Sequence, residues 1–321
     1  MTNFSEHCIY SVDELLNRLH LKVEDSPLKI IKTPEFPFAV SKHYVAQMRK
    51  KDWYDPLLLQ ILPREAENRS VRDFVDDAVG DISSMVAPGL IHKYKNRVLF
   101  LLNQSCLGNC RFCFRRNLSN LYFTDEREAA FEYIKKNRQI TEVLISGGEP
   151  MLLSNTQLEE FLKEIEQIPN VSTLRIHSRL AVMLPQRFDA VFFDIISKFS
   201  QLKNCVFVLH VNHSRELSTE CRNVLSQLKQ SGVLLFSQTV LLNGINDTPE
   251  TLGELFSEVL SAGVVPYYLH QLDRARGTSH FEVDQGRGLE IVQKLREKLP
   301  GYAIPRYVRD DAGALCKTPI G

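Results

Sequence analysis

Three cysteines occur within eight residues, in the sequence Cys106-Leu-Gly-Asn-Cys110-Arg-Phe-Cys113. Cysteine thiolates are the ligands of iron–sulfur clusters and of many structural zinc sites. A cubane [4Fe–4S] cluster needs four ligands, so three cysteines would leave one iron open to a substrate or cofactor. A zinc site requires a fourth protein ligand at short spacing, and neither Cys nor His follows nearby. The motif therefore predicts a [4Fe–4S] cluster, with zinc or three buried structural cysteines as the alternatives.

The cysteine motif follows the first of six short apolar or β-branched segments, which alternate with helical sequences. The predicted strands are 98–102, 143–145, 174–177, 206–210, 234–241 and 264–269, and the predicted helices include 155–168, 219–231, 248–262 and 285–299. Such alternation implies a parallel sheet with right-handed crossovers. Six units are too few for a closed eight-fold barrel. We therefore expect an α/β fold, a partial (βα)6 barrel of TIM type.

The carboxyl ends of these predicted strands are rich in polar residues and glycine. They include Cys106, Ser146-Gly-Gly, His177-Ser-Arg, His210-Val-Asn-His, Asn243-Gly-Ile-Asn-Asp and His270-Gln-Leu-Asp. Active sites of barrels and open parallel sheets lie beyond the carboxyl ends of the strands. We therefore expect the functional residues at this end of the sheet.

Three segments are expected along the chain. Residues 1–90 form an irregular, mainly helical part, with helices after the capping-box pattern Ser11-Val-Asp-Glu14 and around 41–50 and 71–79. Residues 91–300 form the barrel, and residues 301–321 form a C-terminal segment.

The composition excludes several classes of protein. Hydrophobic residues make up 44% of the 321 residues, and 39 basic side chains balance 39 acidic ones. A sizeable core is therefore expected, and the basic excess of a binder of nucleic acid or anionic membranes is absent. We find neither the roughly 20 apolar residues of a membrane span nor a signal-peptide pattern. Seven unevenly spaced cysteines argue against a disulfide framework and favour the reducing cytoplasm.

The cysteine spacing, followed one strand later by Ser146-Gly-Gly-Glu149-Pro, resembles the radical S-adenosylmethionine (SAM) enzymes. In that family the open iron binds the amino and carboxylate groups of SAM, and the glycine-rich strand end faces its methionine part. Further segments extend the resemblance over residues 86–319 to the lysine 2,3-aminomutase family. They are Cys110–Arg116, Leu174–Arg179, Pro266–Asp273, Gly277, His280-Phe281 and Gly301-Tyr302 through Lys317-Thr-Pro319. The most similar branch makes (R)-β-lysine for the modification of elongation factor P.

The resemblance implies a role for each matching residue. The cluster ligands are Cys106, Cys110 and Cys113, and Lys317 is the lysine that binds pyridoxal phosphate covalently. The phosphate and ring contacts are assigned to Lys93, Tyr94, Arg97 and Gln238. The SAM pocket is assigned to Ser146, Gly147, Gly148, Glu149, Arg179 and His210, and His213 also matches a position that lines it. Arg115 matches the residue that binds the substrate's α-carboxylate, and Asp273 and Asp310 match those that bind its ε-ammonium. Asp311 is the alternative to Asp310, and His177, Cys205, Cys221 and Cys316 are expected to be structural.

Two residues depart from the family pattern. Lys93 stands where free-lysine enzymes tend to have arginine, and lysine binds phosphate without a bidentate fork. Glu149 stands where many aminomutases have aspartate.

The resemblance implies a cytoplasmic isomerase that converts L-α-lysine to (R)-β-lysine with a [4Fe–4S] cluster, SAM and pyridoxal phosphate. Its chemistry begins with removal of a hydrogen atom from C3 of lysine. The expected partners are a flavodoxin- or ferredoxin-type electron donor and, functionally, the enzyme that transfers the lysyl group to elongation factor P. Neither a nucleic acid nor a membrane is expected as a partner, and a homo-oligomer is compatible.

The alternatives are a catabolic free-lysine aminomutase, a glutamate 2,3-aminomutase and a non-catalytic iron–sulfur redox or binding protein. Asp273 argues against glutamate, which has no ε-ammonium. The position of Lys317, four residues before the last residue, argues against the longer catabolic enzymes. A binding protein would leave Lys317, Arg115 and Asp273 without a role.

Overall fold

One large sheet dominates the computed structural model, which describes residues 5–118 and 127–321. Ten strands of the described residues form this sheet, and two others, β1 (Cys8–Ile9) and β2 (Val40–Ser41), pair with each other. The strands of the large sheet are β3 (Met85–Ala87), β4 (Leu90–Tyr94), β5 (Arg97–Asn103), β6 (Glu142–Gly147), β7 (Thr173–Ser178), β8 (Asn204–His210), β9 (Leu234–Val240), β10 (Val265–His270), β11 (Arg306–Arg309) and β12 (Thr318–Pro319). Their spatial order, β3 to β12, is also their order in the chain.

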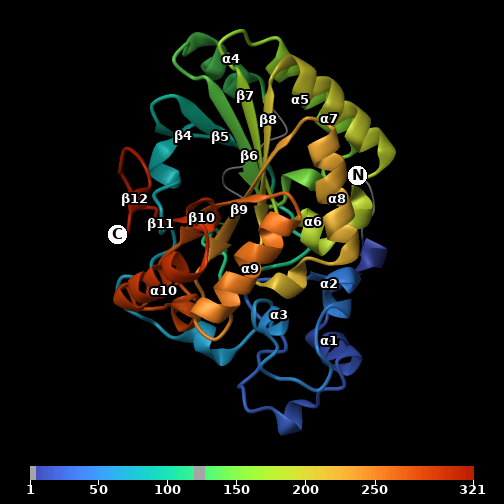
Figure 1. The fold of residues 1–321 in the computed structure, drawn as a ribbon, viewed down its shortest axis with the longest axis vertical. Helices are drawn as coiled ribbons and strands as arrows, with labels where there is room; N and C mark the ends of the chain where they lie inside the picture. Colours follow the sequence, from blue (N-terminus) through green and yellow to red (C-terminus); the bar gives the residue numbers. More distant parts are fainter. Residues whose placement is uncertain (1–4, 119–126) are drawn as a thin grey trace.

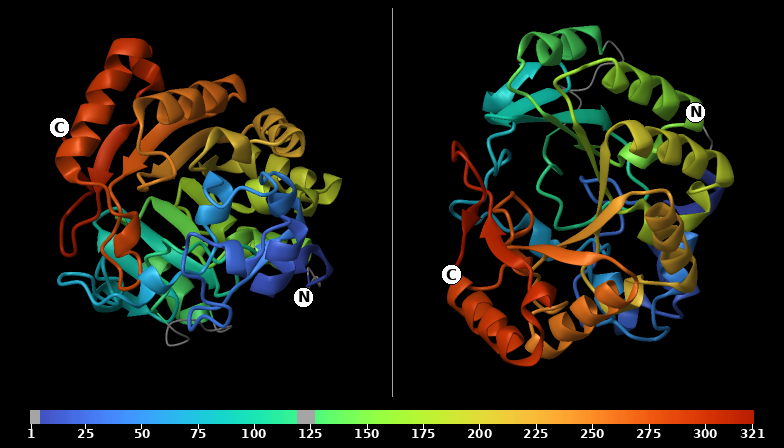
Figure 2. Two further views of the ribbon diagram at one scale, coloured as in Figure 1. Left: turned by 90° about the horizontal axis from the view of Figure 1, so that it is seen from below. Right: turned by 45° about the horizontal axis from the view of Figure 1, so that its top comes forward.

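Strands β5 to β11 run parallel, and helices connect them. The helices are α4 (Glu128–Lys136), α5 (Asn155–Glu166), α6 (Leu180–Met183), α7 (Ala190–Leu202), α8 (Thr219–Gln230), α9 (Pro249–Ser261) and α10 (Gln285–Lys298). The helices form an outer layer around the curved sheet (Figures 1 and 2). The six predicted strands and the partial (βα)6 barrel are thus confirmed, and β11 adds a further parallel strand.

Local sequence explains where the outer helices begin. Ser154, Ser218 and Thr248 precede α5, α8 and α9, and each side-chain oxygen accepts a hydrogen bond from the backbone N–H three residues later. Such caps satisfy N–H groups that have no partner within the helix. The four predicted helices therefore begin within a residue of their expected positions.

Successive side chains along each strand point alternately to the hydrophobic core and to the inside of the barrel. In β6, Val143 and Ile145 are fully buried in the hydrophobic core beneath the helices. Leu144 and Ser146, on the opposite face, line a cavity inside the barrel. This period-two pattern turns one face of each strand towards the helices and the other towards the site.

The two edges of the sheet approach each other. Strand β4 runs antiparallel to β5 at one edge, and β12 runs antiparallel to β11 at the other. Tyr94, at the end of β4, donates a hydrogen bond to Asp310, just after β11, at 3.1 Å. The sheet is therefore curved into an incomplete barrel, seen in the right-hand view of Figure 2.

From residue 5 onwards, the N-terminal part contains three short α-helices, α1 (Val12–Arg18), α2 (Lys42–Ala46) and α3 (Pro56–Leu59), besides single turns of 3₁₀ helix. Ser11 caps α1 as predicted, and α2 lies within the predicted 41–50. The predicted helix over 71–79 is wrong, because this segment forms turns. Val75 instead pairs with the loop after β10, donating to the carbonyl of Arg274 and accepting from the N–H of Arg276, both at 2.9 Å. Its backbone groups are thereby used outside any helix.

The large sheet extends beyond the barrel limits proposed from sequence. Strand β3 and the first residue of β4 precede residue 91, and β11 and β12 follow residue 300. Neither boundary therefore coincides with an edge of the sheet. Within the described ranges, we find no helix that combines the length and apolar character needed to cross a membrane.

Candidate active site

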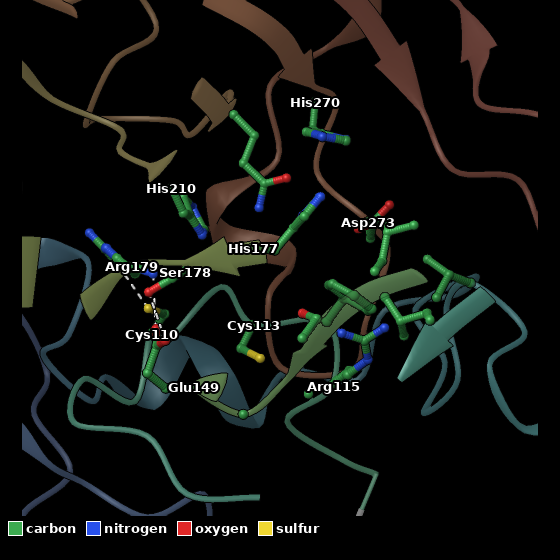
Figure 3. Close-up of a pocket in the computed structure, with 18 of the residues that line it drawn as sticks. Cys110, Cys113, Arg115, Glu149, His177, Ser178, Arg179, His210, His270 and Asp273 are labelled. Atoms are coloured by element: carbon green, nitrogen blue, oxygen red, sulfur yellow. Dashed lines mark hydrogen bonds between the residues drawn. The ribbon is translucent and has the colours of Figure 1, made fainter. Parts of the chain in front are cut away.

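A cavity lies at the carboxyl ends of the barrel strands. Apart from His213, all of the residues assigned to the cluster, the cofactors and the substrate by resemblance line this one cavity. Figure 3 shows Cys110 of the cysteine loop and Asp273 on opposite sides of the cavity. Lys317 pairs with Asp310, and both affect the pKa of Asp273, so these two residues belong to the Asp273 end. We call the Cys110 side the thiol end and the Asp273 side the amine end.

The thiol end is formed by the loop that follows β5. Its backbone is fixed by the N-terminal part, because the N–H groups of Asn109 and Arg111 donate to the carbonyls of Ala39 and Gln60 at 3.0 and 2.8 Å. Burial raises the pKa of the Cys106 and Cys113 thiols, and the neighbouring cysteines raise it further. Unliganded, these thiols are therefore protonated, and binding to a metal would release their protons.

The donor set at the thiol end fits an iron–sulfur cluster better than zinc. Three thiols line the same cavity, which is the number that leaves one iron of a cubane cluster open. A structural zinc site needs four ligands around one ion. Within residues 5–118 and 127–321, no three His, Cys, Asp or Glu side chains, the three thiols included, are gathered to hold a single ion. The preference for a cluster therefore rests on the number of thiols.

Arg179, directly after β7, contacts the middle cysteine of the motif. Its Nη1 donates to the Cys110 Sγ at 2.7 Å, as Figure 3 shows. Its Nη2 donates to the fully buried Glu216 at 2.8 Å, and also to Tyr44 and Gln60 of the N-terminal part at 3.1 and 2.6 Å. The guanidinium thus connects the thiol end to residues far away in sequence.

Glu149 and Gly148 join the end of β6 to its neighbours. The Glu149 carboxylate accepts hydrogen bonds from the Ser178 hydroxyl at 2.7 Å and from the Arg179 N–H at 2.9 Å. Burial nevertheless raises the pKa of Glu149 to about 7. A Cβ on Gly148 would lie 2.5 Å from the carbonyl oxygen of Ser105, so the cysteine loop itself excludes a side chain there.

The amine end contains a lysine that is paired with a carboxylate. Lys317 Nζ lies 2.7 Å from Asp310 Oδ2, and the other oxygen of Asp310 accepts the hydrogen bond from Tyr94. Asp310 lines the cavity, whereas Asp311 binds Arg309 and Thr318 and is not among the lining residues. The geometry therefore favours Asp310 over Asp311 as the residue that faces a ligand.

Asp273 is the second carboxylate of the amine end. It lines the cavity from the beginning of the loop that follows β10. Burial raises its pKa from 3.8 to about 7, and Asp310 adds to this increase, although the nearby Lys317 opposes it. Asp273 is therefore a carboxylate whose charge a bound cation would stabilise.

Lys93 and Arg115 share one carboxylate that the sequence did not single out. Asp81 Oδ1 lies 2.6 Å from Lys93 Nζ, and Asp81 Oδ2 lies 2.7 Å from Arg115 Nε. Asp81 comes from the N-terminal part, just before a 3₁₀ helix, η4 (Ile82–Ser84). Arg97, also assigned to the phosphate, stacks on the Tyr94 ring at 4.8 Å.

Three histidines also line the cavity, namely His177, His210 and His270. The Nε2 atoms of His177 and His210 are buried and have no hydrogen-bond partner among the described residues. Burial lowers the pKa of all three, that of His210 to about 3. These rings are therefore neutral, and His177, which we expected to be structural, faces the same cavity as His210.

Two sequence expectations need correction or extension at this site. His213 is not among the lining residues, because its ring caps η7 (Ser214–Glu216) by accepting from the Arg215 N–H at 3.2 Å. Asp81 lines the cavity but was missed. Its only sequence signal was an acidic residue shortly before the segment that contains Lys93.

This chain is similar to several known proteins. A family model described as a 4Fe–4S single cluster domain matches residues 96–229. The L-lysine 2,3-aminomutase of Buchnera aphidicola subsp. Baizongia pistaciae is 35% identical over 318 residues, which cover 98% of this chain and 93% of the relative. The L-lysine 2,3-aminomutase of Escherichia coli is 35% identical over 312 residues, 96% of this chain and 90% of the relative. A solved radical SAM methyltransferase from Sphaerobacter thermophilus has 18% identity and a TM-score of 0.41, and the match covers 68% of each chain.

Proposed function

This chain belongs to the lysine 2,3-aminomutase family, radical SAM isomerases that use a [4Fe–4S] cluster, SAM and pyridoxal phosphate, and from that premise we propose that it makes (R)-β-lysine from L-α-lysine for elongation factor P. The observation that carries the proposal is the single cavity with three thiols at one end and Lys317, Asp310 and Asp273 at the other. The elongation factor P branch is supported by the segments Arg175–Leu180 and Tyr267–His270, on which the resemblance to that branch depends.

At the thiol end, Cys106, Cys110 and Cys113 would hold the cluster, and the glycine-rich end of β6 and His210 would face SAM. The Arg179 cation beside the Cys110 sulfur offsets part of the negative charge of a ligating thiolate. Glu216 in turn neutralises Arg179 within the buried network. When bound, the cluster, SAM and pyridoxal phosphate supply the radical and covalent chemistry that moves the amino group, and the protein supplies their positions.

At the amine end, Lys317 would bind the pyridoxal, and Lys93, Tyr94, Arg97 and Gln238 would contact its phosphate and ring. Asp310 accepts a hydrogen bond from Lys317. When Lys317 is engaged elsewhere, Asp310 is free to accept from the ε-ammonium of lysine and remains oriented by Tyr94. Asp273 provides a second carboxylate for the same ammonium.

Charge at the amine end discriminates between amino acids. Lysine brings a cation to Asp273 and Asp310 and a carboxylate to Arg115, so each of its charges would meet an opposite one. Glutamate would bring a second carboxylate to the two aspartates, and the repulsion would disfavour it. The same residues therefore favour lysine over glutamate as the substrate.

The proposed function also implies a cellular compartment and protein partners. We propose a reducing cytoplasm, since all seven cysteines are unpaired. We also propose reduction of the cluster by a small flavodoxin- or ferredoxin-type protein and use of the product by the enzyme that modifies elongation factor P.

An anaerobic assay with L-α-lysine, SAM and a reductant tests the proposal. Chiral chromatography should detect (R)-β-lysine as the product, and L-glutamate should give no β-amino acid. Loss of the gene should also remove the β-lysyl mass from elongation factor P in a cell extract. Formation of β-glutamate would contradict the lysine assignment. An intact cluster with no turnover of either amino acid would instead favour a non-catalytic iron–sulfur protein.

A further inference from the structure

Asp81 occupies a central position between two groups that the proposed function assigns to different ligands. Lys93 is assigned to the phosphate of pyridoxal phosphate, and Arg115 to the carboxylate of lysine. One carboxylate contacts both, through a different oxygen for each, at 2.6 and 2.7 Å. All three side chains are largely buried, with exposed fractions of 5% for Asp81, 14% for Lys93 and 15% for Arg115.

The contacts of Asp81 leave the ligand-facing donors of both cations available. Lys93 Nζ uses two of its three N–H groups, on Asp81 and on the carbonyl of Val79 at 2.6 Å. Arg115 binds Asp81 through Nε and stacks on the Phe114 ring at 4.5 Å. Among the described residues, Nη1 and Nη2 of Arg115 have no hydrogen-bond partner. These two atoms form the edge of a guanidinium that binds a carboxylate bidentately.

The backbone around Asp81 is itself fixed. The N–H groups of Asp81 and Ile82 donate to the two oxygens of Asp77 at 2.8 and 2.9 Å. Gly80 has φ +70°, and a Cβ there would lie 3.2 Å from the Cβ of Ala312, in the segment that leads to Lys317. Asp81 is therefore held in a rigid turn against the amine end, as a positioning group needs to be.

We propose that Asp81 is a positioning residue that orients Lys93 and Arg115 together and thereby sets the affinity for both the phosphate of pyridoxal phosphate and the carboxylate of lysine. This inference rests on the proposed function and deepens it. It also gives the N-terminal part of the chain a role in substrate binding.

The direction in which loss of the Asp81 charge changes anion affinity distinguishes a positioning role from simple charge compensation. If Asp81 only compensated charge, its neutralisation would leave two uncompensated cations, and phosphate and carboxylate would bind more tightly. If Asp81 positions the cations, its neutralisation frees both side chains to move, and both anions bind more weakly. Asp81→Asn keeps the shape and removes the charge, so it tests the sign directly.

The experiment uses the full-length protein with its cluster reconstituted anaerobically and its pyridoxal phosphate removed. Equilibrium dialysis with pyridoxal phosphate gives Kd, and turnover after reloading gives KM and kcat for lysine. For Asp81→Asn we expect Kd and KM each to rise by about tenfold, equivalent to about 1.4 kcal/mol. We expect kcat at saturating lysine to change by less than about threefold, as when an interaction serves ground state and transition state alike.

Asp76→Asn is the matched control. Asp76 lies five residues earlier and pairs with Arg276 on the surface, at 2.6 Å, with both side chains more than half exposed. Removing this charge should leave Kd and KM unchanged. Asp81→Glu keeps the charge and should give values between those of the wild type and Asp81→Asn, and it replaces Asp81→Asn in the test if the latter does not fold.

A second substitution shows whether Asp81 acts through Lys93. In a Lys93→Ala background, Asp81→Asn should add little to Kd for pyridoxal phosphate but should still raise KM for lysine. If the two substitutions raise Kd additively, Asp81 does not act on pyridoxal phosphate through Lys93. Equal or tighter binding of both ligands by Asp81→Asn would overturn the inference as a whole. Failure of the wild type to bind pyridoxal phosphate would instead overturn the proposed function.

Discussion

The two ends of the cavity handle charge in opposite ways. At the thiol end, burial keeps the thiols of Cys106 and Cys113 protonated, and Arg179, itself paired with Glu216, is the cation in contact with Cys110. At the amine end, Lys93 and Arg115 are already paired with Asp81, and Lys317 is paired with Asp310.

This difference means that ligands enter the two ends by different physical steps. Ligands of the thiol end must displace protons, so binding of a metal cluster is coupled to proton release. At the amine end, the ammonium of lysine would replace Lys317 on Asp310. The anions would bind the donors that Asp81 leaves available on Lys93 and Arg115, so little charge has to be created. Substitutions at the thiol end should therefore remove a whole cofactor, whereas most substitutions at the amine end should change affinity.

The largest effect is expected at the thiol end. Cys110→Ala removes one of three cluster ligands, so iron content and reductive cleavage of SAM should both be lost. Iron analysis and chromatographic detection of 5′-deoxyadenosine measure the two losses. Cys316→Ala, which changes an exposed cysteine outside the cavity, is the control. A Cys110→Ala protein with wild-type iron and SAM cleavage would contradict the cluster assignment.

Lys317→Ala should abolish β-lysine formation but leave the iron–sulfur cluster at the thiol end intact. The variant should keep wild-type iron content and lose the covalent link to pyridoxal phosphate that borohydride reduction traps. Mass spectrometry after reduction measures this link. Lys298→Ala, which removes an exposed lysine paired with Glu250, should retain it. A reducible link that persists in Lys317→Ala would assign the cofactor to another lysine.

Asp273→Ala should weaken the use of lysine as a substrate without affecting the cofactors. Loss of a charge-assisted hydrogen bond to the ε-ammonium should lower kcat/KM for lysine by roughly tenfold to a hundredfold. Iron content and pyridoxal phosphate content should stay at wild-type values. Steady-state kinetics measures the change, and turnover equal to that of the wild type would remove Asp273 from the lysine site.

The smallest effect is a pH dependence at the amine end. The pKa of Asp273 in the free protein is raised to about 7, so below that pH its carboxyl is neutral and attracts the ammonium less. We expect kcat/KM for lysine to fall by up to about tenfold per pH unit below pH 7, since this ratio reports groups of the free enzyme. Glu149 also has a pKa of about 7, so Asp273→Asn identifies the group. If kcat/KM of Asp273→Asn falls as steeply below pH 7 as that of the wild type, another group is responsible for the pH dependence.

Sequence predicted those parts of the molecule that local patterns determine. The six barrel strands are short apolar segments, and Ser or Thr caps mark the beginnings of three of the helices that follow them. The site residues were found through the cysteine motif and the family resemblance, and they converge because parallel strands end at the same edge of the sheet.

The missed contacts of Arg179 depend on segments that are far apart in the chain. Arg179 contacts Tyr44, Gln60 and Glu216 across separations of 135, 119 and 37 residues. Nothing local to those three residues indicates an arginine partner. The wrong helix over 71–79 has the same origin, because that segment uses its backbone to pair with a loop about 200 residues later.

The account depends on one cavity that brings a SAM-cleaving end and a lysine-binding end together. The most direct test supplies the anaerobic, reduced enzyme with SAM and with lysine that carries deuterium at C3. Mass spectrometry of the 5′-deoxyadenosine formed should find deuterium, because the hydrogen would move between ligands held in the same cavity. Cleavage of SAM with no deuterium in 5′-deoxyadenosine, while lysine is bound, would contradict the account.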